Sequence, residues 1–183
     1  MRNRWKTGLL ALVLGSLSMT AAAQDPATMD KELEGRRQEV AGELDKLPRF
    51  PGPFDHVTYS VSGTVVTLGG FATSPSLKAD AQKVVERLEW VTGVENEIEF
   101  HQSEPAADQI REETLAVLVD ALPDAFAERF PDLRIKVDPA LNVTIVGTLS
   151  PINRGRLESA LIRVDQLALV KSVNNQVEFK KEK

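Results

Sequence analysis

Two stretches of this sequence, VENEIEF (Val94–Phe100) and VNNQVEF (Val173–Phe179), follow one pattern, V-x-N-x-[I/V]-E-F. In an extended chain, alternate residues lie on one face, so each stretch places a valine, an asparagine, a β-branched residue and a phenylalanine together. The opposite face is polar. The pattern therefore predicts a half-buried strand that occurs twice, and it raises the possibility that a whole structural unit is repeated.

The residues before the first copy predict four further elements. Apolar residues at helical spacing predict a helix ending near Leu47, before the proline-rich run Pro48–Pro53. Two alternating segments, HVTYSV and TVVTLGGFAT, joined at Ser62-Gly63, then predict a β-hairpin. Ser74-Pro75 is typical of a helix N-terminus and starts a second amphipathic segment. The predicted order is α-β-β-α-β.

The same order recurs up to Phe179. NVTIVG (Asn142–Gly147) aligns with VVTLGG (Val65–Gly70), and Ser150-Pro151 repeats the Ser-Pro pair. The fold class predicted is α+β: two tandem α-β-β-α-β units, each a three-stranded mixed sheet covered on one face by two helices. We expect Pro139 rather than glycine to shape the second hairpin turn.

Several residues of the repeat are expected to have structural roles. Asn96 and Asn175 share a face with apolar residues, where an amide must find hydrogen-bond partners, so we expect both in equivalent, largely buried places. A structural role is favoured over ligand contact. Glycines in the repeat are expected where the backbone turns or another backbone packs closely, rather than as a phosphate cradle. These glycines are Gly63, Gly70, Gly93 and Gly147.

The N-terminus has the features of a secretory signal peptide. Basic residues at 2, 4 and 6 precede the apolar run GLLALVLGSL, and Ala21-Ala22-Ala23 offers a small-residue cleavage site before Gln24. The apolar run is too short to cross a bilayer comfortably, although an uncleaved anchor is the alternative interpretation. The chain contains no cysteine, so no lipid anchor is expected after cleavage.

These features together give a predicted division of the chain. It comprises a signal peptide (1–23), a flexible leader (24–30), a first unit (31–101), a linker (102–107), a second unit (108–179) and a basic tail (180–183).

Charge is unevenly distributed. Removal of the signal peptide lowers 22 basic residues to 19 against 27 acidic ones, so the formal charge moves from −5 to −8 and a nucleic-acid partner is not expected. Residues 24–105 carry 8 basic and 15 acidic groups, whereas residues 134–183 carry 9 basic and 5 acidic groups. Four of these basic residues are candidates for contact with anionic lipid headgroups, with a solvated helix face as the alternative. They are Arg154, Arg156, Arg163 and Lys171.

Residues for catalysis or metal binding are scarce. His56 and His101 are the only histidines, there is no thiol, and no G-x-S-x-G or phosphate-binding glycine loop occurs. Glu97 and Glu99 alternate with apolar residues and should lie on the solvated face of a strand. We therefore expect no enzymatic activity, no catalytic residue, no metal and no cofactor.

Three segments resemble the BON domain, a small bacterial envelope module. They are SGTVVTLGG (62–70), SPSLKADAQKVVERLE (74–89) and TGVENEIEF (92–100). The resemblance covers Asp30–Phe100 closely and Ile110–Phe179 more loosely. It implies the α-β-β-α-β fold, a periplasmic or outer-envelope location, no enzymatic activity, and attachment to phospholipid or envelope components.

Two function classes stay open at this point. One is a module that binds phospholipid or an envelope protein and supports envelope integrity. The other is a stress-related periplasmic protein that acts only through protein–protein contacts, without membrane affinity. Many two-copy members of the family are lipoproteins anchored through a cysteine, so the absence of cysteine argues against permanent anchoring here.

Overall fold

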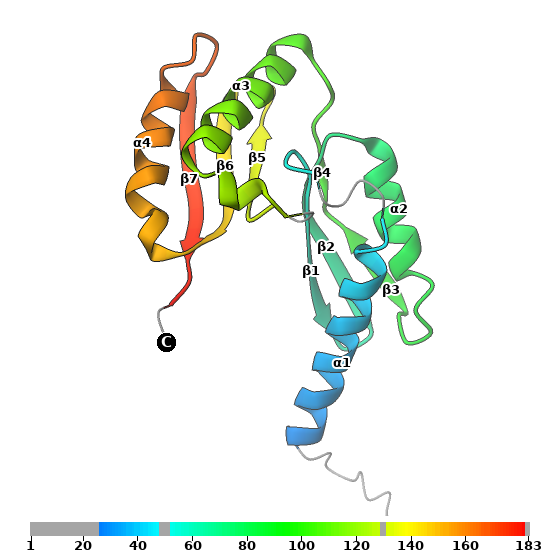
Figure 1. Ribbon diagram of the computed structural model, residues 1–183. Helices are drawn as coiled ribbons and strands as arrows, with labels where there is room; N and C mark the ends of the chain where they lie inside the picture. The colour runs from blue at the N-terminus through cyan, green and yellow to red at the C-terminus, as the bar shows by residue number, and fades with distance from the viewer. Residues whose placement is uncertain (1–25, 48–51, 129–130, 182–183) are drawn as a thin grey trace, which may run out of the picture.

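The structure is a computed structural model that describes residues 26–47, 52–128 and 131–181. In this part of the chain two β-sheets lie side by side, each with helices on one face (Figure 1). The predicted signal peptide, residues 1–23, lies outside the described residues.

The first unit contains the five predicted elements, with its third strand divided in two. It consists of α1 (Pro26–Leu44), β1 (His56–Ser62), β2 (Val65–Ala72), α2 (Pro75–Val85), β3 (Gly93–Asn96) and β4 (Glu99–Phe100). β1 pairs antiparallel with β2, while β3 and β4 both pair with β2 in parallel. Buried apolar residues of α1 and α2 pack against Leu68 of β2 and against Ile98, which lies between β3 and β4.

The second unit repeats this plan with an unbroken third strand. It consists of α3 (Pro105–Ala121), the 3₁₀ turn η1 (Pro123–Phe126), β5 (Leu133–Val137), β6 (Asn142–Leu149), the 3₁₀ turn η2 (Pro151–Asn153), α4 (Arg154–Asp165) and β7 (Ser172–Phe179). β5 and β6 are antiparallel, and β6 and β7 are parallel. A separate apolar core lies between this sheet and its two helices. The predicted α+β fold of two α-β-β-α-β units is confirmed.

Two predicted boundaries are wrong. α1 begins at Pro26, so residues 26–30, expected as a flexible leader, are helical. α3 begins at Pro105, so residues 105–107 belong to the helix and not to the linker. Proline suits the first helical position because its missing N–H would be unpaired there, and Ala107 is already buried in the second core.

Gly70 and Gly147 occupy corresponding places on β2 and β6, and both adopt positive φ (95° and 138°). A Cβ atom on Gly70 would lie 1.9 Å from the carbonyl oxygen of His56. A Cβ atom on Gly147 would lie 2.0 Å from the carbonyl oxygen of Asp132. Each unit therefore needs glycine here, because the neighbouring backbone fills the space of a side chain.

The two hairpin turns differ. Gly63 has φ 60° in the first turn, whereas Leu141 has φ 66° in the second. The Asp138 carboxylate accepts a hydrogen bond from the backbone N–H of Asn142 (2.9 Å), and the Asp138 carbonyl accepts one from Leu141 (2.9 Å). An aspartate-stabilised turn thus holds Leu141 in a conformation that glycine adopts more easily.

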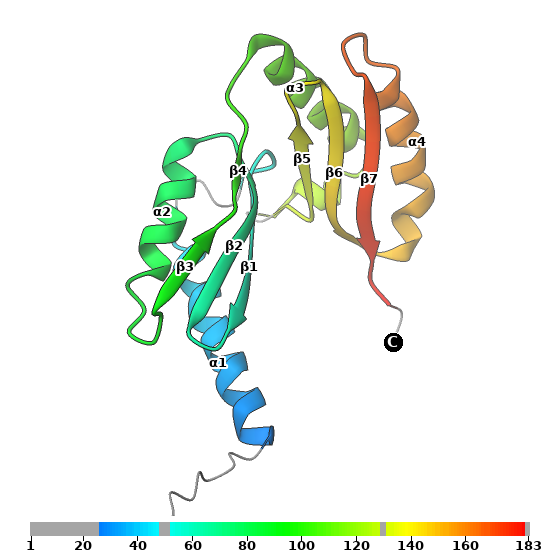
Figure 2. The same ribbon diagram turned by 180° about the vertical axis from the view of Figure 1, so that it is seen from behind.

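The inner edge strand β5 of the second sheet faces the end of the first sheet where β1 begins and β4 lies, while β3 and β7 lie on the outer sides (Figures 1 and 2). The backbone N–H of Ile135 donates a hydrogen bond to the carbonyl of Pro53 (2.7 Å). The side chain of Arg134 donates to the carbonyl of Asp55 (3.1 Å). Residues before β1 therefore accept hydrogen bonds from β5, the inner edge strand of the second sheet.

Candidate functional site

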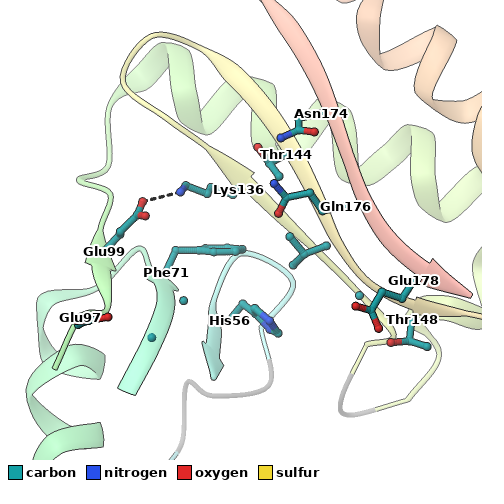
Figure 3. Close-up of a pocket in the computed structure, with 14 residues that line it drawn as sticks. His56, Phe71, Glu97, Glu99, Lys136, Thr144, Thr148, Asn174, Gln176 and Glu178 are labelled. Atoms are coloured by element: carbon teal, nitrogen blue, oxygen red, sulfur yellow. Dashed lines mark hydrogen bonds and ion pairs between the residues drawn. The ribbon is translucent and has the colours of Figure 1, made fainter. Parts of the chain in front are cut away.

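An open groove of about 740 Å³ lies between the units, where the helix-free face of the second sheet meets the first unit (Figure 3). Its walls are mostly hydroxyl, amide and charged side chains. Those of the second unit include Thr144, Asn174, Gln176 and Glu178. The groove offers hydrogen-bonding groups to a polar ligand and little apolar surface.

Both histidines lie at the junction, on either side of Phe71. The ring centroids of His56 and Phe71 are 5.8 Å apart, and those of His101 and Phe71 are 6.5 Å apart. Burial, followed by the charge of Arg134, lowers the pKa of His56 below its ordinary value. Burial, followed by the charge of Lys136, lowers the pKa of His101. The neutral forms are thus favoured in the fold.

Glu99 forms an ion pair with Lys136 across the junction. The hydrogen bond from Lys136 is the main reason that the pKa of Glu99 lies below its ordinary value. Glu99 is held ionised by this contact, so it is an electrostatic link between the units and a poor proton donor. Glu97, which also lines the groove, is exposed. Within residues 26–47, 52–128 and 131–181, no group of three histidine, aspartate or glutamate side chains could hold a metal ion.

The two asparagines of the repeated strand differ in burial. Asn96 is half-buried and donates hydrogen bonds to the Lys78 carbonyl (2.9 Å) and the Gln82 side chain (3.2 Å). Asn175 is exposed, so the expectation that it is buried is wrong. Its side chain lines a hollow beside Leu161 of α4, whose apolar side chain cannot pair with an amide.

One interaction is nevertheless common to both asparagines. The side-chain oxygen of Asn96 accepts from the backbone N–H of Ile98 (3.3 Å), and that of Asn175 accepts from Val177 (3.1 Å). The asparagine of the repeat therefore supports its own strand in both units, whereas the link to a helix is present at Asn96.

The four lipid-binding candidates do not form one surface. Arg154 lies over the ring of Phe179, with its guanidinium carbon 3.9 Å from the ring centroid. Arg163 is paired with Asp120 of α3 (2.8 Å). Lys171 precedes β7, at the opposite end of that strand from Phe179. Arg154 and Arg156 therefore share one end of α4, and Lys171 is separated from them by the length of the sheet.

The end of the unit that holds Arg154 has two features that the sequence analysis missed. Ile152 is 86% exposed, a high value for an isoleucine. The backbone N–H of Lys180 donates to the carbonyl of Leu149 (2.9 Å), which places the basic tail beside the residues that lead into α4. We call this surface the α4 tip. It comprises Ile152, Arg154, Arg156, Lys180 and Lys181.

A signal for the α4 tip was present in the sequence. The Ser-Pro pairs align, so Ile152 corresponds to Ser76 of the first unit. Ser76 is exposed and hydrogen-bonded to Ser74 (2.7 Å). An isoleucine in the place of a solvated serine, next to two arginines, identifies a surface that differs between the units.

Comparison with known proteins gives a family match within the first unit. Residues 33–102 match the family described as BON domain. Two solved structures from Chlamydia trachomatis share 10% identity with this chain. One, of CdsD, a structural protein of the type III secretion system, covers 80% of this chain and 93% of its own at a TM-score of 0.35. The other, the C-terminal domain of CdsD, covers 79% and 96% at 0.34.

No curated protein matched the chain. Among the described residues, no helix combines the length and the apolar character needed to span a membrane.

Proposed function

We propose that this protein is an exported, non-enzymatic module of the bacterial envelope that attaches to anionic phospholipid surfaces through the α4 tip. The BON match of residues 33–102 supports an envelope-associated role. The observation that carries the proposed site is the exposed Ile152 among four basic side chains.

The chemistry of the α4 tip suits a headgroup interface. Each basic residue near an anionic surface contributes about 1 kcal/mol, and full burial of an isoleucine side chain contributes about 1.5–3 kcal/mol. The ring of Phe179 orients Arg154, whose side chain remains exposed. The electrostatic attraction between these basic residues and the headgroups is weakened by salt. Insertion of Ile152 among the headgroups would add an apolar contribution to it.

The charge of the two units favours one orientation. Residues 24–105 have 15 acidic and 8 basic groups, so an anionic leaflet would repel the first unit. Residues 134–183 have 9 basic and 5 acidic groups. Both effects fade over a Debye length of about 8 Å at physiological salt, so they act only when the protein is close to the surface.

The alternative function is a periplasmic stress protein that acts through protein–protein contacts alone. The polar groove between the units supports this alternative, because its amide and hydroxyl side chains could bind an extended polar segment of another protein. The two functions differ in the surface that they use.

Vesicle flotation tests the lipid proposal. The protein should float with phosphatidylglycerol vesicles at low salt and much less with neutral phosphatidylcholine vesicles. Ile152→Asp and Arg156→Glu should each reduce binding about tenfold, a loss of about 1.4 kcal/mol. Met29→Asp is the matched control, because Met29 is also an exposed apolar residue (54%) but lies on α1 of the first unit.

The outcomes separate the two functions. Unchanged binding in both α4-tip variants would show that a different surface contacts lipid. Absence of flotation on anionic vesicles at low salt would favour the protein–protein function.

A further inference from the structure

β7 is an outer edge strand that is paired regularly along its whole length. It has eight residues, pairs with β6 throughout, and no other described strand pairs with it (Figures 1 and 2). Residues 174–176 are all exposed. An edge of this kind presents unpaired backbone N–H and C=O groups, which can pair with another strand.

Two other edges are less suited to strand addition. The edge formed by β3 and β4 is broken between these strands, carries Glu95, and ends at Glu99, which is paired with Lys136 at the junction. The inner edge strand β5 is already contacted by Pro53. β7 has no proline, lysine or bulge, and its one charged residue is Glu178. The broken, acidic edge of β3 and β4 thus has devices that protect natural sheet edges, and these devices are absent from β7.

An apolar surface lies beside this edge. A hollow of about 290 Å³ runs between α4 and β7, and its apolar walls are Leu161, Ile162 and Val173. Ile162 is 62% exposed. A strand added to β7 would place alternate side chains over this hollow, so edge and hollow together can provide both backbone hydrogen bonds and apolar contact.

The sequence of β7 is complementary to itself in the antiparallel direction. With Asn175 opposite its own copy, Val173 faces Val177 on the helix side, and Asn174 faces Gln176 on the open side. In this register, residues from the same face of the sheet remain together, as the two-residue period of a strand requires. Ser172 faces Glu178, and no two like charges are directly opposite.

We propose that two copies of this chain associate through β7, forming a continuous six-stranded sheet with a two-fold axis at Asn175. The α4 helices of the two copies become neighbours on one face of this sheet, and each Ile162 is covered at their interface. This association is independent of lipid binding, because the α4 tip lies at the other end of α4.

A single engineered cysteine tests the register directly, because the chain has none of its own. Opposed residues of an antiparallel pair have Cα atoms about 4.5–5.5 Å apart, within the range of about 4.4–6.8 Å that a disulfide can bridge. Asn175→Cys should therefore form a disulfide-linked dimer rapidly under mild oxidation.

Asn174→Cys is the matched control. It is exposed on the same strand, but in this register its two copies lie more than about 7 Å apart and should cross-link slowly. Equal cross-linking by both variants would show random collision and overturn the proposed pairing. Failure of Asn175→Cys to cross-link would also overturn it.

Sedimentation velocity over a range of protein concentrations gives a second measurement. The unmodified chain should show a monomer–dimer equilibrium, and Ile162→Asp should weaken it about tenfold. Ile152→Asp should leave it unchanged, so loss of lipid binding and loss of the dimer can be distinguished. A protein that is monomeric at every concentration would contradict the proposal.

Discussion

The two units share a backbone fold and differ in the side chains and the sheet edge that they expose. Gly70 and Gly147 have the same conformational requirement, yet Ser76 of the first unit corresponds to the exposed Ile152 of the second. The third strand is broken and acidic in the first unit but continuous and nearly uncharged in the second. Backbone geometry constrains the positions that build the fold, whereas the outer surfaces of the two units differ.

The largest effects should follow from changing the shared glycines. Gly70→Ala and Gly147→Ala should each lower the free energy of unfolding by about 3 kcal/mol or more, because a Cβ would collide with backbone at positive φ. Gly93→Ala, where the nearest atom is 3.7 Å from the new Cβ, should change it by less than about 0.5 kcal/mol. Chemical denaturation provides the measurement. Tolerance of alanine at only one of the two sites would break the equivalence of the units.

A smaller effect should distinguish the two asparagines. Asn96→Ala should cost about 1–2 kcal/mol, because it removes hydrogen bonds that join β3 to α2. Asn175→Ala should cost no more than about 0.5 kcal/mol, since its side chain is exposed. Denaturation of the two variants under identical conditions measures the difference. Equal losses of unfolding free energy would mean that the stability comes from the hydrogen bond that each asparagine side chain accepts from its own strand, and not from the link to α2.

Acidification should produce a modest loss of stability through the junction. The pKa values of His56 and His101 are lowered in the folded chain, so their neutral forms contribute stability that is present above about pH 6.5. Below that pH the unfolded chain binds more protons than the folded one, and the free energy of unfolding falls. Denaturation at about pH 7.5 and about pH 5.5 should show this fall.

The charged groups around the junction define the control for that experiment. Arg134 opposes protonation of His56; Lys136 and Arg111 oppose that of His101, while Glu99 favours it. The Asp138 carboxylate also interacts with the charge of His101. The pKa values of Glu99 and Asp138 are lowered, so they titrate below this window. Replacing both histidines with glutamine should flatten the dependence; an unchanged slope would exclude them as its cause.

The sequence was sufficient to predict the fold because the repeated strand and the Ser-Pro pairs follow local rules of period and capping. It was insufficient for Asn175, whose burial depends on the residue of α4 that faces it across the unit. The candidate site was found in part: Arg154 and Arg156 lie at the α4 tip, but Arg163 pairs with α3 and Lys171 lies at the other end of β7. These four residues are close in the sequence, but this closeness did not show that they lie at opposite ends of α4 and β7.

Histidines 56 and 101 show the same limit. The pairing of β1 and β4 with β2 brings both beside Phe71 within the first unit, whereas the charges of Arg134 and Lys136 reach them only where the two units meet. No pattern within either unit predicts a contact that depends on how the units pack together.

The most direct test of the account is an environment-sensitive fluorophore attached to a single cysteine at matched positions of the two units. With Ile152→Cys, phosphatidylglycerol vesicles should shift the emission to shorter wavelength, because the label enters the headgroup region. With Ser76→Cys, the corresponding exposed position of the acidic first unit, the emission should not change. A shift at position 76, or none at position 152, would contradict the claim that the second unit makes the membrane contact.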